Sequence, residues 1–208
     1  MSFLSWERIK ELDSTGISEK ISRKELGKFK IEAQKEAEFK TLCYFLEEYE
    51  RITGKEFVEI ISSEKPDFLC REEQIPKIVG VELTQIQRGH PETIAYDSII
   101  HKREYMKIED ALEIIQESVE TKEQKRQKND WKHPNSSILV IEFNDIPLEQ
   151  IHPLLNKKNL PDVYDTGFSE IWIVDLTGIE AYRDVELFCL IPACYEGYYP
   201  RPLQKPYG

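Results

Sequence analysis

Three nearly continuous apolar runs constrain the fold of this chain more than any other feature. They cover residues 138–143, 171–176 and 185–191. A strand with one solvent-exposed face alternates apolar and polar residues, whereas a continuous apolar run is typical of a strand that is buried on both faces of a sheet. The sequence therefore predicts a central sheet with both faces covered.

Helical patterns precede and separate these runs. Apolar residues recur at spacings of three and four from Ile31 to Ile52, which predicts one long amphipathic helix that ends at Gly54. A second helical pattern covers residues 91–129, and a short helix is expected over residues 148–156. These helices supply the layers that a buried sheet requires.

Residues 57–61, 67–70 and 78–84 have a strand-like pattern, and the connections between them suit hairpin loops. The predicted order is helix, three-strand meander, helix, strand, short helix, strand, strand. This order indicates an α/β sandwich with a mixed central sheet over residues 31–194. Residues 1–30 are expected to form a helical extension, and residues 195–208 a Pro/Tyr-rich tail.

Charge and hydropathy limit the function classes. Lys and Arg total 28 against 39 Asp and Glu, so the formal net charge is −11. A general affinity for nucleic acid or for an anionic membrane is therefore not expected, and any nucleic-acid contact should be local. No apolar run approaches the ~20 residues of a membrane span, and the first residues do not resemble a signal peptide. We expect a cytoplasmic protein.

Two carboxylates are predicted to meet across the second hairpin. If the loop is centred between Gln74 and Ile75, the numbers of paired residues add to 149, and Asp67 lies opposite Glu82. Directly opposed side chains have Cβ atoms ~5 Å apart, close enough for both carboxylates to bind one ion. Their mutual repulsion is relieved by a divalent cation, and hard oxygen ligands suit Mg²⁺ or Mn²⁺. Taken singly, Asp67 is an ordinary turn residue and Glu82 an ordinary solvent-facing strand residue.

The arrangement resembles the PD-(D/E)XK nuclease superfamily. The resemblance consists of a helix, then Pro66-Asp67 at the start of a strand, then Glu82-Leu83-Thr84 in the next strand, followed by a helix and further strands. It implies a restriction-endonuclease-like α/β/α sandwich and Mg²⁺-dependent hydrolysis of phosphodiester bonds, with DNA as the substrate. It also implies that the protein acts as a homodimer or in a larger assembly.

Thr84 stands where the family has its catalytic lysine, and threonine cannot supply a positive charge. Four cations on the following segment are alternative sources of that charge. They are Lys102, Arg103, Lys122 and Lys125. Gln85 or Gln87 is a candidate for orienting a water molecule. The sequence leaves these choices open.

Further candidates lie on the helices. Glu38 is in register with Leu42 and Phe45 on the stripe that should meet the sheet, and the family's first helix often adds a metal-binding acid. A helix-edge glutamate that reaches solvent is the alternative interpretation. Lys122, Lys125 and Arg126 belong to the most basic segment and are candidates for contact with a phosphate backbone, although cations are also common at the C-terminal ends of helices.

The sequence supports three hypotheses of different classes. The first is a divalent-metal-dependent nuclease in which Asp67 and Glu82 bind Mg²⁺ or Mn²⁺, with help from Glu38, while Thr84 and Gln85 complete the catalytic site. The second is a catalytically inactive nuclease-fold protein that binds nucleic acid or a protein partner. The third is an unrelated α/β interaction domain whose acids lie on its surface.

Overall fold

The computed structural model describes residues 23–75, 77–86, 107–128, 131–144, 146–177 and 185–192. Two long helices, one short helix and six strands occur in these ranges. They are α2 (Arg23–Thr53), β1 (Phe57–Ser62), β2 (Phe68–Glu72), β3 (Ile78–Ile86), α4 (Ile108–Gln127), β4 (Ser137–Phe143), α5 (Leu148–Ile151), β5 (Glu170–Asp175) and β6 (Glu186–Ile191). Single turns of 3-10 helix cover Pro134–Ser136, His152–Leu154 and Pro161–Tyr164.

The chain divides into two compact units, Met1–Cys43 and Tyr44–Gly208. The boundary lies inside α2, so the last ten residues of this helix belong to the second unit. The boundary that the sequence suggested lies earlier, at residue 30, and the three predicted segments stay predictions. The second unit holds the whole sheet and the candidate site.

The six strands form one sheet in the order β1-β2-β3-β4-β5-β6. Strands β1, β2 and β3 are antiparallel neighbours, β3, β4 and β5 are parallel neighbours, and β6 returns antiparallel to β5. The predicted meander and the predicted mixed sheet are thus confirmed. The parallel pairs require crossover connections, and α4 lies in the first of them while α5 lies in the second.

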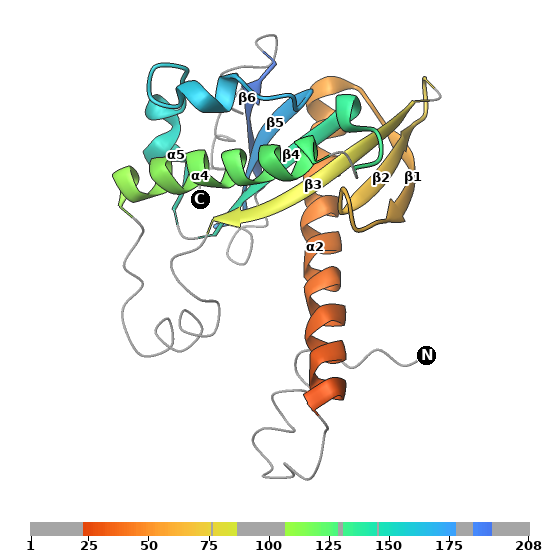
Figure 1. The fold of residues 1–208 in the computed structure, drawn as a ribbon. Coiled ribbons are helices and arrows are strands. Elements are labelled where there is room, and N and C mark those ends of the chain that lie inside the picture. Colours follow the sequence, from red (N-terminus) through yellow and green to blue (C-terminus); the bar gives the residue numbers. More distant parts are fainter. Residues whose placement is uncertain are drawn as a thin grey trace, which may run out of the picture. The chain divides into compact units, whose positions relative to one another are not determined.

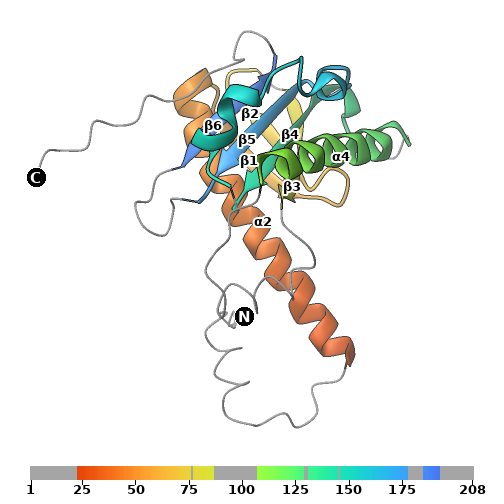
Figure 2. The ribbon, with the colours of Figure 1, turned by 90° about the vertical axis from the view of Figure 1, so that its left-hand side faces the viewer.

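Helix α4 covers one face of the sheet, where Figures 1 and 2 show it lying over β3 and β4. Its buried residues Ala111, Ile115 and Val119 recur every four positions and therefore form one stripe. They belong to an apolar cluster with side chains of β4, β5 and β6, among them Ile141 and Ile173. This packing fixes which side of α4 meets the sheet.

The opposite face is packed with aromatic rings. Tyr49, near the end of α2, lies 5.4 Å from the ring of Trp172 in β5 and 5.8 Å from the ring of Phe57 in β1. The carboxylate of Glu170 is buried here, accepting hydrogen bonds from Tyr49 Oη at 3.1 Å, Lys55 Nζ at 3.0 Å and Trp172 Nε1 at 2.8 Å. Three donors satisfy this acid, so it has a structural role in joining α2 to the sheet.

Where the structure describes them, the predicted elements agree with it in type and order, but α2 begins at Arg23, before the predicted start at Ile31. Helix α2 ends at Thr53, and Gly54 follows in a left-handed conformation with φ 70°, as expected for a glycine directly after a helix. The short helix is α5, continued by the 3-10 turn at His152–Leu154. The first part of the helix predicted over residues 91–129, most of the N-terminal extension and the tail lie outside the described residues. In the described ranges, each helix is too short or too polar to cross a membrane.

Candidate metal centre

The hairpin β2–β3 brings the two predicted acids together. Phe68 pairs with Val81 and Cys70 with Val79, so the numbers of paired residues add to 149, as the loop length predicted. Asp67 directly precedes β2 and lies opposite Glu82 in this register. The backbone N–H of Asp67 donates to Glu82 Oε2 at 3.2 Å. The predicted juxtaposition of the two acids is therefore confirmed.

A second hydrogen bond orients the Asp67 carboxylate. The backbone N–H of Leu83 donates to Asp67 Oδ2 at 2.9 Å. Each acid is thus held by the backbone beside the other acid, because Asp67 N contacts Glu82 while Leu83 N contacts Asp67. Backbone groups of the hairpin therefore hold one oxygen of each carboxylate.

The turn before β2 is shaped by a close contact between Pro66 and Gly80. A Cβ atom built on Gly80 would lie 2.5 Å from Pro66 Cγ, which only a glycine can avoid. The N–H of Ser63 also donates to the carbonyl oxygen of Asp67 at 2.7 Å and closes this turn. The Pro-Asp pair is therefore positioned by the absence of a side chain in the neighbouring strand.

Helix α4 adds a cation to the acids. Lys122 Nζ donates to Glu82 Oε1 at 2.6 Å and to the carbonyl oxygen of Leu83 at 2.8 Å. Lys122 lies three residues after Val119 and seven after Ile115, so it extends the buried stripe of α4 toward β3. Of the four cations that the sequence left open, Lys102 and Arg103 lie outside the described residues, and of the other two the structure brings Lys122 to the acids.

Burial and charge act in opposite directions on Glu82. Its residue is only 5% exposed, and desolvation raises the pKa of the carboxyl group above its ordinary value of 4.5. The charge of Lys122 lowers this pKa, and the nearby charge of Asp67 raises it again, so that the net shift is upward. A second cation at this acid would favour its ionised form.

The donor set suits a hard divalent cation. The carboxylates of Asp67 and Glu82 and the carbonyl group of Leu83 offer oxygen ligands, which Mg²⁺ and Mn²⁺ prefer. The ammonium group of Lys122 already contacts two of these oxygens, so this part of the site accepts a positive charge. Within the described ranges no cluster of three or more His, Cys, Asp and Glu occurs, so the protein acids here are the two of the hairpin.

Thr84 and Gln85 lie on different faces of β3. Thr84 pairs with Ile141 on the face of Glu82 and is half-buried. Gln85 points to the other face by the alternation of a strand, where its Nε2 donates to Glu142 Oε1 at 3.0 Å. The structure thus brings Thr84, but not Gln85, to the side of the sheet that carries the acids, and Gln87 lies outside the described residues.

The remaining candidates have other surroundings. Glu38 belongs to the unit Met1–Cys43 and accepts a hydrogen bond from Gln34 Nε2 at 2.8 Å. Its predicted role as a metal ligand stays a prediction. Lys125 is exposed on α4.

Arg126 is part of a packed ion pair. Its guanidinium contacts Glu123 at 2.7 Å and lies 5.7 Å from the centre of the Phe168 ring. The pKa of Arg126 is raised, chiefly by the hydrogen bond to Glu123. These contacts tie α4 to the segment before β5, and a phosphate would have to compete with Glu123 for this side chain.

Comparisons with known proteins do not assign the chain to a family. The chain matches no protein-family model, no curated protein and no solved structure.

Proposed function

We propose that this protein is a divalent-metal-dependent nuclease with a restriction-endonuclease-like fold, which hydrolyses phosphodiester bonds of DNA. The observation that carries the proposal is the contact between Lys122 and Glu82 beside Asp67. Two acids on a hairpin and one lysine from a neighbouring helix are groups that metal-assisted phosphodiester hydrolysis uses. The proposal is supported further by the order of the helices and strands, which resembles the PD-(D/E)XK superfamily.

In this proposal Asp67 and Glu82 hold Mg²⁺ or Mn²⁺. The bound ion would polarise the phosphate and lower the pKa of a water molecule. The N–H of Leu83 keeps the Asp67 carboxylate in place for this task. Lys122 supplies the positive charge that Thr84 cannot, and it approaches the acids from α4 instead of from the strand.

An inactive nuclease-fold protein is the second candidate, and one observation favours it. Both oxygens of the Glu82 carboxylate already accept hydrogen bonds from the protein, one from Lys122 and one from the N–H of Asp67. An ion pair of this kind can replace a metal ion as the partner of a buried carboxylate. Such a protein would bind nucleic acid or a protein partner without cleaving it.

Cleavage assays separate the two candidates. The wild type and the Asp67→Asn and Glu82→Gln variants are incubated with plasmid, linear duplex DNA, single-stranded DNA and RNA in Mg²⁺ and in Mn²⁺. Glu59→Gln is the matched control, because Glu59 is an exposed acid of β1 that pairs with Arg71. We expect cleavage by the wild type and the control and its loss in both site variants. If the wild type cleaves no substrate and its melting temperature does not respond to metal, the nuclease proposal is wrong.

The Lys122→Met variant tests the role of the lysine. We expect cleavage to fall by about 10²–10³-fold, the usual effect of removing one group that stabilises charge in a transition state. We also expect the metal-dependent rise in melting temperature to persist, because the two acids remain. Lys157→Met, which removes an exposed lysine outside α4, should cleave at the wild-type rate. A Lys122→Met protein that melts earlier but cleaves normally below its melting temperature would show that the ion pair is only structural.

A further inference from the structure

Two exposed loops meet beside the carboxylate pair. The backbone N–H of Lys132, before β4, donates to the carbonyl oxygen of Lys65, before β2, at 3.1 Å. This bond brings together two residues that are far apart in the sequence. Both lysines are exposed. Their loops therefore form one continuous surface, which we call the lysine rim.

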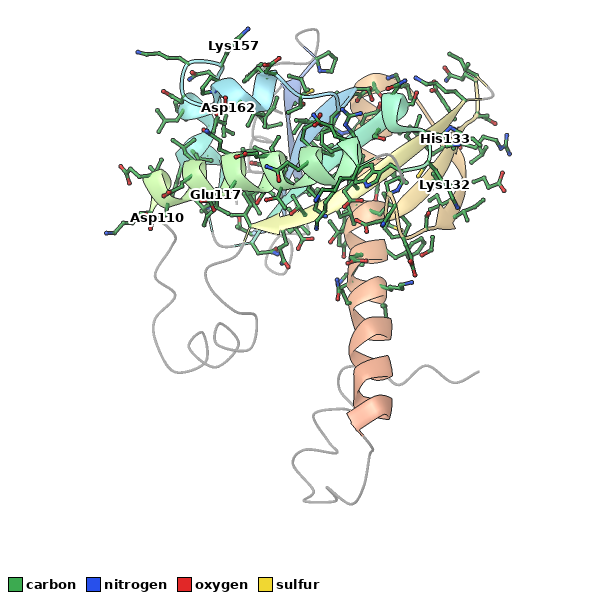
Figure 3. All side chains as sticks on the ribbon, in the orientation of Figure 1. Asp110, Glu117, Lys132, His133, Lys157 and Asp162 are labelled. Carbon is green, nitrogen blue, oxygen red and sulfur yellow. The ribbon has the colours of Figure 1, made fainter. Side chains whose placement is uncertain are left out.

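The Lys132 side of the rim is held by its neighbours. The side chain of Trp131 is buried, with its ring 5.9 Å from the ring of Phe168. The carbonyl oxygen of His133 accepts hydrogen bonds from the N–H of Ser136 at 3.0 Å and from Ser137 Oγ at 3.1 Å. The segment thus has a fixed buried side, and Lys132 and His133 lie exposed at the surface (Figure 3).

The Lys65 side of the rim leads directly into the metal centre. Pro66 and Asp67 follow Lys65 in sequence, and Pro66 packs against Gly80. Gly80 in turn pairs with Ser137, which lies at the start of β4 after the Lys132 loop. The lysine rim therefore borders the two acids on the side where β3 and β4 begin.

We propose that Lys65 and Lys132 bind the sugar-phosphate backbone of a nucleic-acid strand and deliver it to the carboxylate pair. A chain with a net charge of −11 repels a polyanion at long range, so binding needs local cations. The lysine rim places two of them next to the candidate metal centre, from two loops that a backbone hydrogen bond connects. This inference rests on the proposed function, because it names the surface through which that site would receive its substrate.

Glu64 allows a test of whether charge at the lysine rim controls the binding of nucleic acid. It is an exposed acid in the same turn as Lys65. Its carboxylate should oppose the binding of a phosphate backbone that the lysines favour. Removal of this acid should therefore strengthen binding if nucleic acid lies on the rim, and should have no effect if it binds elsewhere.

Binding is measured by fluorescence anisotropy with labelled duplex and single-stranded oligonucleotides, in EDTA to prevent metal-dependent cleavage and over a series of salt concentrations. For the double variant Lys65→Gln/Lys132→Gln we expect weaker binding and a log-log salt slope that is smaller by about 1–2, since each lost phosphate contact removes about 0.7–0.9. Glu64→Gln should bind more tightly than the wild type. Lys157→Gln/Lys158→Gln is the matched control, because it removes two exposed lysines with the same change of net charge.

The result that overturns the inference is a double variant with the affinity and salt slope of the wild type, or a wild type that binds neither DNA nor RNA. Hydrolysis of bis(p-nitrophenyl) phosphate is measured in parallel with Mg²⁺ or Mn²⁺. This small diester has no backbone to span the lysine rim, so the double variant should hydrolyse it as the wild type does. Loss of this activity in Asp67→Asn reports on the proposed function, while the binding data report on the rim, and the two failures are therefore distinguishable.

Discussion

At Glu82, burial and the charge of Lys122 act in opposite directions on the pKa of the carboxyl group. Because its pKa is higher in the folded chain than its ordinary 4.5, the folded protein binds this proton more tightly than the unfolded protein does. The stabilisation from this group is present below pH 4.5 and is lost as the pH rises through the folded pKa. We therefore expect the free energy of unfolding of the wild type, relative to that of Glu82→Gln, to fall as the pH rises from 4.5.

Denaturant unfolding in EDTA across this pH range measures the difference between the two proteins. EDTA is needed because a bound cation would favour the ionised carboxylate and hide the effect. Glu59→Gln, at an exposed ion pair on the surface of β1, serves as the control. A difference between the wild type and Glu82→Gln that stays constant or grows with pH would contradict the predicted direction.

At the residue scale the sequence predicted the acids better than the cation. The meeting of Asp67 and Glu82 depends on the length of one hairpin loop, which is a local property. The contact of Lys122 with Glu82 depends on how α4 is rotated against the sheet. This rotation is set by the packing of Ile115 and Val119 against residues that are distant in the sequence. One signal was present all the same, since Lys122 continues the apolar stripe of its helix, where a lysine needs a buried partner.

At the scale of elements, the site depends on how closely the turn before β2 approaches β3. Gly80→Ala would place a Cβ atom 2.5 Å from Pro66 Cγ, so the turn with Asp67 must move away from Glu82. We expect a loss of about 1–3 kcal/mol in stability, typical of an overpacked site. The rise in melting temperature that the proposed metal site predicts for the wild type in Mg²⁺ should also be lost.

A second glycine allows the loss of stability to be distinguished from the loss of the metal response. Gly54 has φ 70° and open space around the position of its missing Cβ atom. Gly54→Ala should cost about 1–2 kcal/mol, because an L-residue is disfavoured in the left-handed conformation. It should leave the metal response intact. If both alanine variants keep the metal response, the contact between Pro66 and Gly80 does not position the acids.

The elements that the sequence predicted best are those with strong local patterns. The continuous apolar runs became β4, β5 and β6, whose residues are almost all buried. The irregular pairing between Phe57 and Glu59 in β1 could not be predicted from the sequence. One extra residue in a strand does not change the types of residue that mark it as a strand. The order of the strands in the sheet comes from long-range pairing, and no window of sequence contains it.

At the scale of the whole molecule, the charge of the chain opposes its proposed substrate. The net charge is −11, yet the lysine rim and Lys122 place cations beside the two acids. Long-range repulsion and short-range attraction depend differently on salt. The Debye length is about 30 Å at 0.01 M salt and about 8 Å at 0.15 M, so moderate salt screens the repulsion by the whole chain first.

We therefore expect the association rate with a labelled oligonucleotide to rise as salt increases from about 0.01 M toward 0.15 M, where distant acids are screened. At higher salt the affinity should fall, because contacts between lysines and phosphates exchange with counterions. Stopped-flow anisotropy in EDTA measures both phases. Lys157→Gln/Lys158→Gln makes the chain more negative without touching the lysine rim, so its rate should rise more steeply at low salt while its affinity declines as in the wild type. An association rate that only falls with salt would mean that local cations dominate at every distance, and the acidity of the whole chain would then have no part in substrate capture.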